Sequence, residues 1–411
     1  MAYRPLVYAL FVYWGCFCCL PIHAQSMDRR ISGLFGGTFS TSITPRDITD
    51  AQSPRIAERF RKLSAALAAA RSQAPIPSAS GAFRFLWDSK FDNFVRVDEG
   101  LGSSLAERAR TLGAHVGILS ASYTHVDFDT LDGDRLNRLR AVQPSLSQGF
   151  LDSLPSDDRQ RASDDLIETR LNLSFGLDLF FLTAAYGVTD SIDVSAALAI
   201  NRARMRAGAL AVIQDPHGDD GSFFTLQQPG VIIGSAEPEC SIDFRCAEDG
   251  FSASSFGTGD LFLRAKWHAG DTVFADFAAV GVLTIPTGNA DNFLGFHNPT
   301  FTPWLIASKR WGPLSPHLNL GYAFRGGSDA PGQAEWIAGA DLRTFEWLTL
   351  DADFLGFHDD VRGGSNVIQS AVGFRMNPFG QTVIGATFQF PLNRDGLRAD
   401  VIYSAQIEYT F

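Results

Sequence analysis

From Gly113 to the end of the chain, hydrophobic and polar residues alternate with a period of two. Successive side chains of a β-strand point to opposite faces, so this spacing predicts strands with one apolar and one polar face. The last segment shows the pattern most clearly: Val401, Tyr403, Ala405, Ile407, Tyr409 and Phe411 share one face, and Ile402, Ser404, Gln406, Glu408 and Thr410 share the other. About twelve such segments follow Gly113, each long enough for a tilted crossing of a bilayer.

The connections between these segments alternate in length. Short turns are expected near residues 188–191, 269–271, 312–314, 344–346 and 377–380. Longer loops are expected at 129–167, 214–257, 288–298, 326–333, 359–364 and 393–398. Outer-membrane barrels show this alternation, with short turns in the periplasm and long loops outside the cell.

Large aromatic residues gather beside the predicted short turns. Amphipathic rings prefer the headgroup boundary of a membrane, and a soluble sandwich has no reason to collect them at one end. They are Tyr186, Trp267, Trp311, Trp347, Phe379 and, at the same level, Phe411. The pattern therefore predicts an all-β fold, a transmembrane antiparallel up-and-down β-barrel of about 12 strands. The alternative is a soluble periplasmic sandwich or barrel, whose apolar face would be the interior.

The membrane interpretation assigns the two faces of each strand. The apolar face should contact lipid and the polar face should line the lumen. We expect Leu171, Leu173, Phe175, Leu177 and Leu179 to face lipid. The predicted turns also put Lys266 opposite Asp276, and Arg343 opposite Asp351. The candidate lumen-lining residues are Arg264, Lys266, Asp276, Asp341, Arg343, Asp351, Asp353 and Arg375.

The first residues have the features of a secretory signal. Arg4 precedes an apolar run from Leu6 to Leu20, and Ala24 offers a small residue at the cleavage point. Residues 1–24 are therefore predicted to be a cleaved signal peptide, and three of the five cysteines leave with it. Cys240 and Cys246 remain, and a single pair in an oxidising compartment is expected to form a disulfide.

Residues 25–112 differ from the barrel sequence. From Ser53 to about Ser72, Ile56, Phe60, Leu63 and Leu67 recur at helical spacing. Two placements stay open for this partly helical segment. It is either a periplasmic extension or a plug that enters the lumen of a barrel formed by residues 113–411.

Charge and motifs exclude several functions. The net charge of −11 argues against nucleic-acid binding, which needs a basic footprint. The chain contains no G-x-S-x-G elbow, P-loop or H-E-x-x-H motif, and the histidines are scattered along it. We therefore predict no enzyme, no metal and no cofactor, while a barrel hydrolase stays the least favoured alternative.

Several stretches resemble the "MetA-pathway of phenol degradation" family of outer-membrane transporters, which is grouped with the transporters of fatty acids and other hydrophobic compounds. The similar stretches are the segments 184–194, 259–267, 283–288 and 106–109. The resemblance covers roughly residues 168–411 and implies uptake of small aromatic or apolar molecules. It offers no binding residues to carry over.

The sequence thus predicts an outer-membrane channel or transporter for small hydrophobic or aromatic compounds in a Gram-negative bacterium. The alternative is a structural or binding barrel closed by its N-terminal segment. The expected partners are membrane lipid, the ligand and the barrel assembly machinery, which would recognise the last strand ending at Phe411. The loop 214–257 could cover the extracellular mouth, and Pro286, Pro303 and Pro391 could weaken strand pairing for a sideways exit.

Overall fold

The structure is a computed structural model that describes residues 26–36, 63, 66–67, 84–88, 93–97, 100–144, 152, 155–156, 159, 166–214, 246–327, 332–361 and 364–411. The predicted signal peptide, most of the predicted helix at 53–72 and Cys240 lie outside these residues. None of the described helices is long and apolar enough to cross a membrane.

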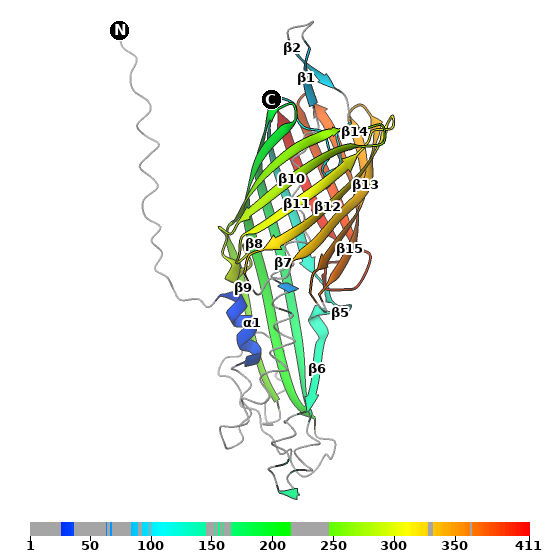
Figure 1. Ribbon diagram of the computed structural model, residues 1–411. Coiled ribbons are helices and arrows are strands. Elements are labelled where there is room, and N and C mark those ends of the chain that lie inside the picture. Colours follow the sequence, from blue (N-terminus) through cyan, green and yellow to red (C-terminus); the bar gives the residue numbers. More distant parts are fainter. Residues whose placement is uncertain are drawn as a thin grey trace, which may run out of the picture.

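Twelve antiparallel strands in the described part of the chain close into a barrel (Figure 1). Each strand pairs with its neighbour in sequence, and β3 closes the ring by pairing with both β7 and β18. The strands are β3 (Gly117–Phe128), β7 (Leu166–Thr189), β8 (Ile192–Gln214), β9 (Cys246–Asp271), β10 (Asp276–Ile285), β11 (Thr300–Ser308), β12 (Leu314–Arg325), β13 (Gln333–Phe345), β14 (Leu348–Asp359), β15 (Asn366–Phe379), β16 (Thr382–Pro391) and β18 (Ile402–Thr410). The predicted fold class, an all-β up-and-down barrel of about 12 strands, is confirmed.

Smaller elements lie at the two ends of the barrel. The hairpin of β1 (Arg84–Asp88) and β2 (Asn93–Val97) lies at the end of the short turns, whereas α1 (Met27–Gly36) lies at the end of the long loops (Figure 1). The long-loop end also carries β4 (Thr130–Leu131), β5 (Asp134–Arg135), η2 (Leu136–Arg138), β6 (Leu139–Pro144), η3 (Ala290–Asn292) and β17 (Leu397–Arg398).

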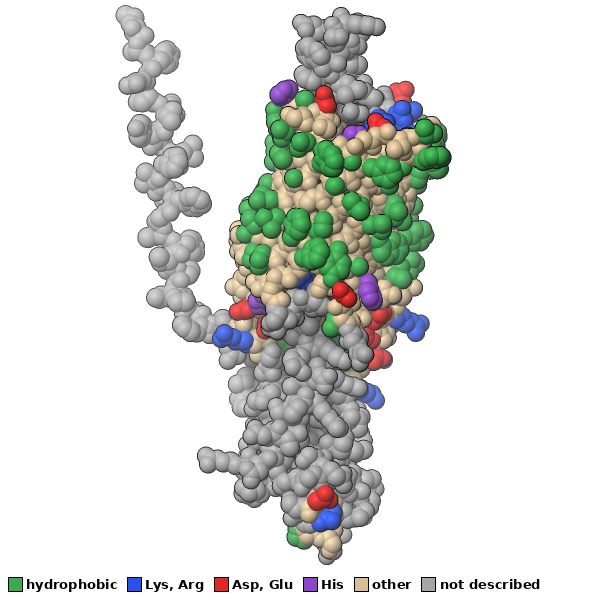
Figure 2. Space-filling view, viewed as in Figure 1, with side chains coloured by type: hydrophobic (Ala, Val, Ile, Leu, Met, Phe, Trp, Pro, Cys, Tyr) green, Lys and Arg blue, Asp and Glu red, His purple; other side chains and the backbone are tan. Residues whose placement is uncertain are grey.

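The outer wall of the barrel is apolar, as the alternation predicts. Figure 2 shows hydrophobic side chains covering this wall between two zones where charged side chains appear. The rings beside the short turns are exposed, among them Trp267 at 55%, Trp311 at 62% and Phe379 at 77%. We call this exposed apolar surface the belt. Exposure of so many large apolar side chains needs an apolar solvent, because monomeric soluble proteins rarely expose contiguous patches of this kind.

The predicted faces are wrong in one part of the molecule. Strands β7, β8 and β9 are 24, 23 and 26 residues long, and they run well beyond the other strands at the long-loop end (Figure 1). We call this part the extension. Along the inner face of β7, Leu171 and Leu173 in the extension, and Phe175, Leu177 and Leu179 opposite β3, are at most 3% exposed and point inward.

These leucines belong to a hydrophobic core that the sequence did not predict. The core also holds Met27 and Ile31 of α1, and Leu63 and Leu67 of the N-terminal region. The outward positions of the extension, such as Arg170 and Asn172, are exposed and polar. The extension is thus apolar inside and polar outside, as expected of a structure surrounded by water.

Two predicted cross-strand pairs are also wrong. The turn after Asp271 spans residues 272–275, so Asp276 lies opposite Asp271, and Lys266 lies opposite Val280. On β14, Asp351 lies opposite Asp341, and Arg343 lies opposite Thr349. The turn between β9 and β10 is longer than assumed and the turn between β13 and β14 is shorter, and the shift of register follows from these lengths.

The predicted loop 214–257 is shorter than expected. Its second part, from Cys246 to Gly257, belongs to β9 and pairs with β8. The remainder lies outside the described residues, so the proposed cover of the mouth and the Cys240–Cys246 disulfide stay predictions.

Candidate functional site

Residues 100–112, which we call the lumen segment, lie inside the barrel at the short-turn end. Hydrogen bonds tie this segment to inward-facing groups of several strands. The Leu101 amide donates to Oγ1 of Thr349 at 3.0 Å, and the Ser103 hydroxyl donates to Oδ2 of Asp353 at 2.8 Å. At its far end, the Leu112 amide donates to both carboxylate oxygens of Asp193, at 3.0 and 3.2 Å.

Ion pairs strengthen this attachment. Glu107 pairs with Arg264 and, at 3.3 Å, with Lys266. Arg108 pairs with Asp341 at 2.8 Å, and Arg110 pairs with Asp276 at 3.2 Å. Removing one partner of a buried pair leaves an uncompensated charge and costs about 3–5 kcal/mol, so the segment is firmly held.

The structure places the eight predicted charged residues on the inward face of their strands. Arg264, Lys266, Asp276, Asp341 and Asp353 all contact the lumen segment. Arg343 is half-buried at the short-turn end of β13. Asp351 is buried, and Arg375 is buried and donates to Glu408 at 2.6 Å.

Sequence reasoning missed the residue that joins two of these acids. His317 of β12 is 5% exposed and lies between them, with Nε2 at 2.6 Å from Asp353 and Nδ1 at 3.7 Å from Asp341. Only the register of β12 with β13 and β14 brings these three side chains together. Among the described residues, no group of three or more His, Cys, Asp or Glu could hold a metal ion.

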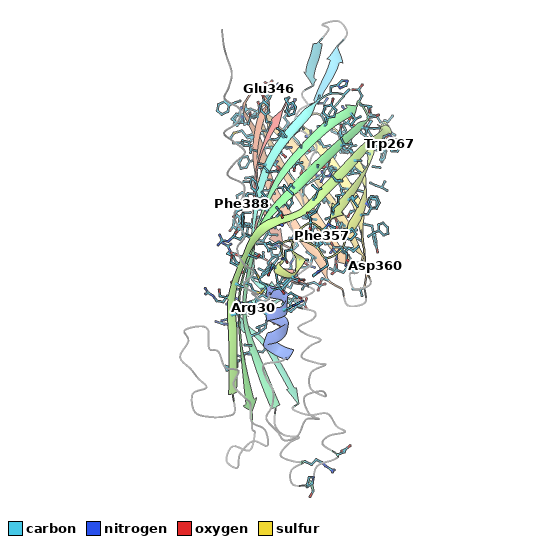
Figure 3. The ribbon with its side chains drawn as sticks, turned by 90° about the vertical axis from the view of Figure 1, so that its left-hand side faces the viewer. Arg30, Trp267, Glu346, Phe357, Asp360 and Phe388 are labelled. Carbon is cyan, nitrogen blue, oxygen red and sulfur yellow. The ribbon has the colours of Figure 1, made fainter. Side chains whose placement is uncertain are left out.

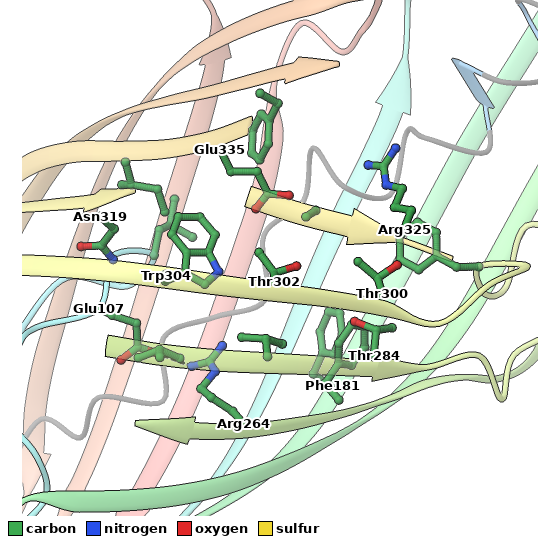
Figure 4. Close-up of a pocket in the computed structure, with 18 of the residues that line it drawn as sticks. Glu107, Phe181, Arg264, Thr284, Thr300, Thr302, Trp304, Asn319, Arg325 and Glu335 are labelled. Carbon is green, nitrogen blue, oxygen red and sulfur yellow. Dashed lines mark hydrogen bonds and ion pairs between the residues drawn. The ribbon is translucent and has the colours of Figure 1, made fainter. Parts of the chain in front are cut away.

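A cavity of about 150 Å³ lies next to the lumen segment, on its side towards the long loops. Glu107 and Arg264 lie at one end of it (Figure 4), and Leu105 also lines it. Its walls are mostly apolar and aromatic, formed by Leu179, Phe181, Phe262, Val280, Val282, Trp304, Ile337 and Phe357. A pocket with apolar walls and a few polar groups is the usual form of a small-molecule site.

A second set of polar groups lies at the other end of the cavity. Thr284 pairs with Thr300 across β10 and β11, and Thr300 pairs with Arg325 across β11 and β12. Glu335 of β13 points into the same space (Figure 4). The cavity therefore offers an apolar middle with hydroxyl, guanidinium and carboxylate groups towards the long loops.

The loop between β10 and β11 folds inward beside the cavity. Asp260, which is fully buried, accepts hydrogen bonds from the Gly288 amide at 3.1 Å and the Phe296 amide at 2.9 Å. Asn201 donates to the Leu294 carbonyl at 2.7 Å. These contacts hold Phe296 against the cavity. They also join the stretches 259–267 and 283–288, which lie apart in the sequence.

The barrel wall beside the cavity is weakened at Pro303. The β11–β12 ladder pairs Phe301 with Phe324 and Trp304 with Gly321, and has no paired residues between these positions. Proline cannot donate to a ladder. Thr302 and Trp304, on either side of Pro303, both line the cavity. The other two prolines lie at strand ends, since Pro286 follows β10 and Pro391 ends β16.

No protein-family model and no curated protein matches the chain. Among solved structures, an outer membrane channel from Pseudomonas putida F1 is 13% identical, with a TM-score of 0.44 over 74% of this chain and 98% of that chain. The P. putida toluene transporter TodX is 8% identical, with a TM-score of 0.34 over 72% and 89% of the two chains. A Pseudomonas aeruginosa FadL homologue is 10% identical, with a TM-score of 0.32 over 72% and 90%.

Similarities at these levels carry no argument about this chain, and its family membership stays a prediction.

Proposed function

We propose that the chain is an outer-membrane channel for small hydrophobic or aromatic compounds. The observation that carries the proposal is the apolar cavity enclosed by a barrel whose outer belt is apolar. A closed barrel satisfies its backbone hydrogen bonds in lipid, so this belt suits a bilayer. The predicted signal peptide, and recognition of the last strand by the assembly machinery, fit the same destination.

The size of the cavity fits a ligand with a single ring. A cavity of about 150 Å³ lined by apolar side chains is large enough for benzene. The aromatic walls supply contacts for a ring, and the threonine hydroxyls could bond one polar substituent. We therefore infer monocyclic aromatic compounds as the preferred class.

A route for such a ligand follows from the polarity of the lumen. The hydrophobic core of the extension is continuous with the cavity, because Leu179, Phe181 and Phe262 belong to both. Beyond the cavity, the lumen segment and its ion pairs fill the short-turn end. An apolar ligand that leaves sideways at Pro303 into the bilayer passes from one apolar environment to another, at little cost in free energy. The charged short-turn end of the lumen opposes its passage.

Filling the cavity tests this proposal. Ala323 is 2% exposed and lines the cavity, so Ala323→Phe would occupy its volume. Ala338→Phe adds the same ring on the outward face of β13 and is the matched control. We expect Ala323→Phe to lower accumulation of labelled toluene in cells by about tenfold or more, with Ala338→Phe near the unmodified level. Equal uptake by both variants would contradict a role for the cavity.

A second candidate is a barrel that binds ligand without transport. The ion pairs of the lumen segment favour this second candidate, because the segment closes the short-turn end of the barrel. Conductance in planar bilayers shows whether the barrel passes ions. Release of ligand from loaded vesicles shows whether it passes apolar compounds, and a channel differs from a binding barrel in these two measurements. A barrel that takes up ligand but never releases it into the bilayer supports the second candidate.

A further inference from the structure

Three arginines lie in one line on the outer face of β8, directly beyond the belt. On the same face, Val194 and Leu198 are exposed apolar residues of the belt, at 42% and 39%. Ile200 follows on this face, and the next three outward positions are Arg202, Arg204 and Arg206. The change from apolar to basic within four residues marks the level at which acyl chains give way to headgroups.

The three arginines differ in how their charge is balanced. Arg204 lies 3.4 Å from Asp178 and 4.0 Å from Asp127. Asp178 is already engaged by the Tyr123 hydroxyl at 2.8 Å and by His125 at 2.7 Å. These neighbours fix Arg204 in the middle of the line.

Arg202 and Arg206, on either side, are exposed to the surroundings of the barrel. Arg202 donates a long hydrogen bond of 3.5 Å to the Ser254 hydroxyl, and Arg206 lies between Ser174 and Ser252 in the sheet. Four residues of strand separate the two arginines by about 13 Å. That is about the length of a disaccharide carrying a phosphate at each end.

We propose that this face of β8 binds the phosphorylated disaccharide headgroup of a glycolipid in the outer leaflet, such as lipid A. Guanidinium groups bind phosphate through two parallel hydrogen bonds, which makes arginine well suited to this headgroup. The acyl chains of the same lipid would lie on Val194 and Leu198. The proposal rests on the membrane location in the proposed function.

The position of the arginines also fixes a direction. They lie at the long-loop rim, which faces outside the cell in the proposed orientation. Arg310, in the turn between β11 and β12, is an exposed arginine at the opposite rim and would meet the inner leaflet. It therefore serves as a matched control for charge and exposure.

Native mass spectrometry of the detergent-purified chain tests the proposal, with bisphosphorylated lipid A and dephosphorylated lipid A as probes. We expect the phosphorylated lipid to bind at least about tenfold more tightly, because the dephosphorylated lipid lacks the groups that make charge-assisted contacts with the two arginines. Arg202→Gln/Arg206→Gln should abolish this preference, Arg202→Lys/Arg206→Lys should retain most of it, and Arg310→Gln should leave it unchanged.

Three results would overturn the proposal: equal binding of both lipids, unchanged binding by the glutamine variant, or full competition by inorganic phosphate, which would indicate a free-anion site. Heat-modified gel mobility of each variant checks folding. Absence of the lipid preference in the unmodified chain, with normal mobility and normal toluene uptake, contradicts this inference alone. Loss of mobility shift in the unmodified chain contradicts the membrane barrel itself.

Discussion

The belt and the extension use the same alternation with opposite faces inward. In the belt, Leu318 of β12 points outward and is 41% exposed, while its neighbours His317 and Asn319 are buried. In the extension, Leu173 of β7 is buried, and the polar Asn172 on the same strand is exposed. The two regions are surrounded by different solvents, and the solvent decides which face of a strand is inside.

The largest expected effect lies in the extension. Leu173→Asp would bury a carboxylate among apolar side chains, at a cost of more than about 4 kcal/mol. We expect the extension to lose its protease resistance while the belt part of the barrel stays folded, because one region of a protein can open locally without global unfolding. Limited proteolysis in detergent measures this. The control is Asn172→Asp, on the outer face of the same strand, and equal sensitivity of both variants would contradict the inward face.

The next effect lies in the polar lumen of the belt. Asp353→Ala removes the partner of His317 and the acceptor of the Ser103 hydroxyl. Breaking this buried network should lower the free energy of unfolding by about 3–5 kcal/mol. Urea unfolding in lipid vesicles measures the change, with Glu346→Gln in an exposed turn as the control (Figure 3). A change below about 1 kcal/mol would indicate that water reaches Asp353.

A smaller effect is expected on the outer face of the belt. Leu318→Arg puts a charge near the middle of β12, where the cost in a bilayer is about 2–4 kcal/mol. Leu314→Arg, on the same face at the short-turn end, should cost about 0–1 kcal/mol because the side chain reaches the interface. The same unfolding assay compares the two. Equal costs would contradict a bilayer around the belt.

The smallest effect concerns the wall beside the cavity. Pro303→Val supplies the missing amide to the β11–β12 ladder and should strengthen it by about 1 kcal/mol. We expect toluene uptake to fall by about threefold to tenfold if ligand leaves there, since 1 kcal/mol corresponds to a factor of about five. Pro391→Val at the end of β16 is the control. Unchanged uptake by Pro303→Val would place the exit elsewhere.

Period-two alternation was sufficient to predict the barrel, its strand number and the order of turns and loops, because each depends only on local spacing. It could not predict the inward face of Leu171–Leu179, since both faces of β7 fit the same pattern until the surroundings are known. The register errors at Asp276 and Asp351 came from turn length.

The candidate site was predictable only in part. The inward charges were found from the sequence, whereas His317, Asp260 and the cavity depend on contacts between strands far apart in the chain. The helix α1 has Met27 and Ile31 at helical spacing, so its apolar face is visible in the sequence of residues 27–31.

The reversal of faces can be measured directly with single fluorescent labels at Leu318 and Asn172, in a chain whose Cys240 and Cys246 are replaced by serine and which is reconstituted in vesicles. The account predicts that brominated acyl chains quench the label at residue 318 and that aqueous iodide quenches the label at residue 172. Quenching of residue 318 by iodide, or of residue 172 by brominated lipid, would contradict it.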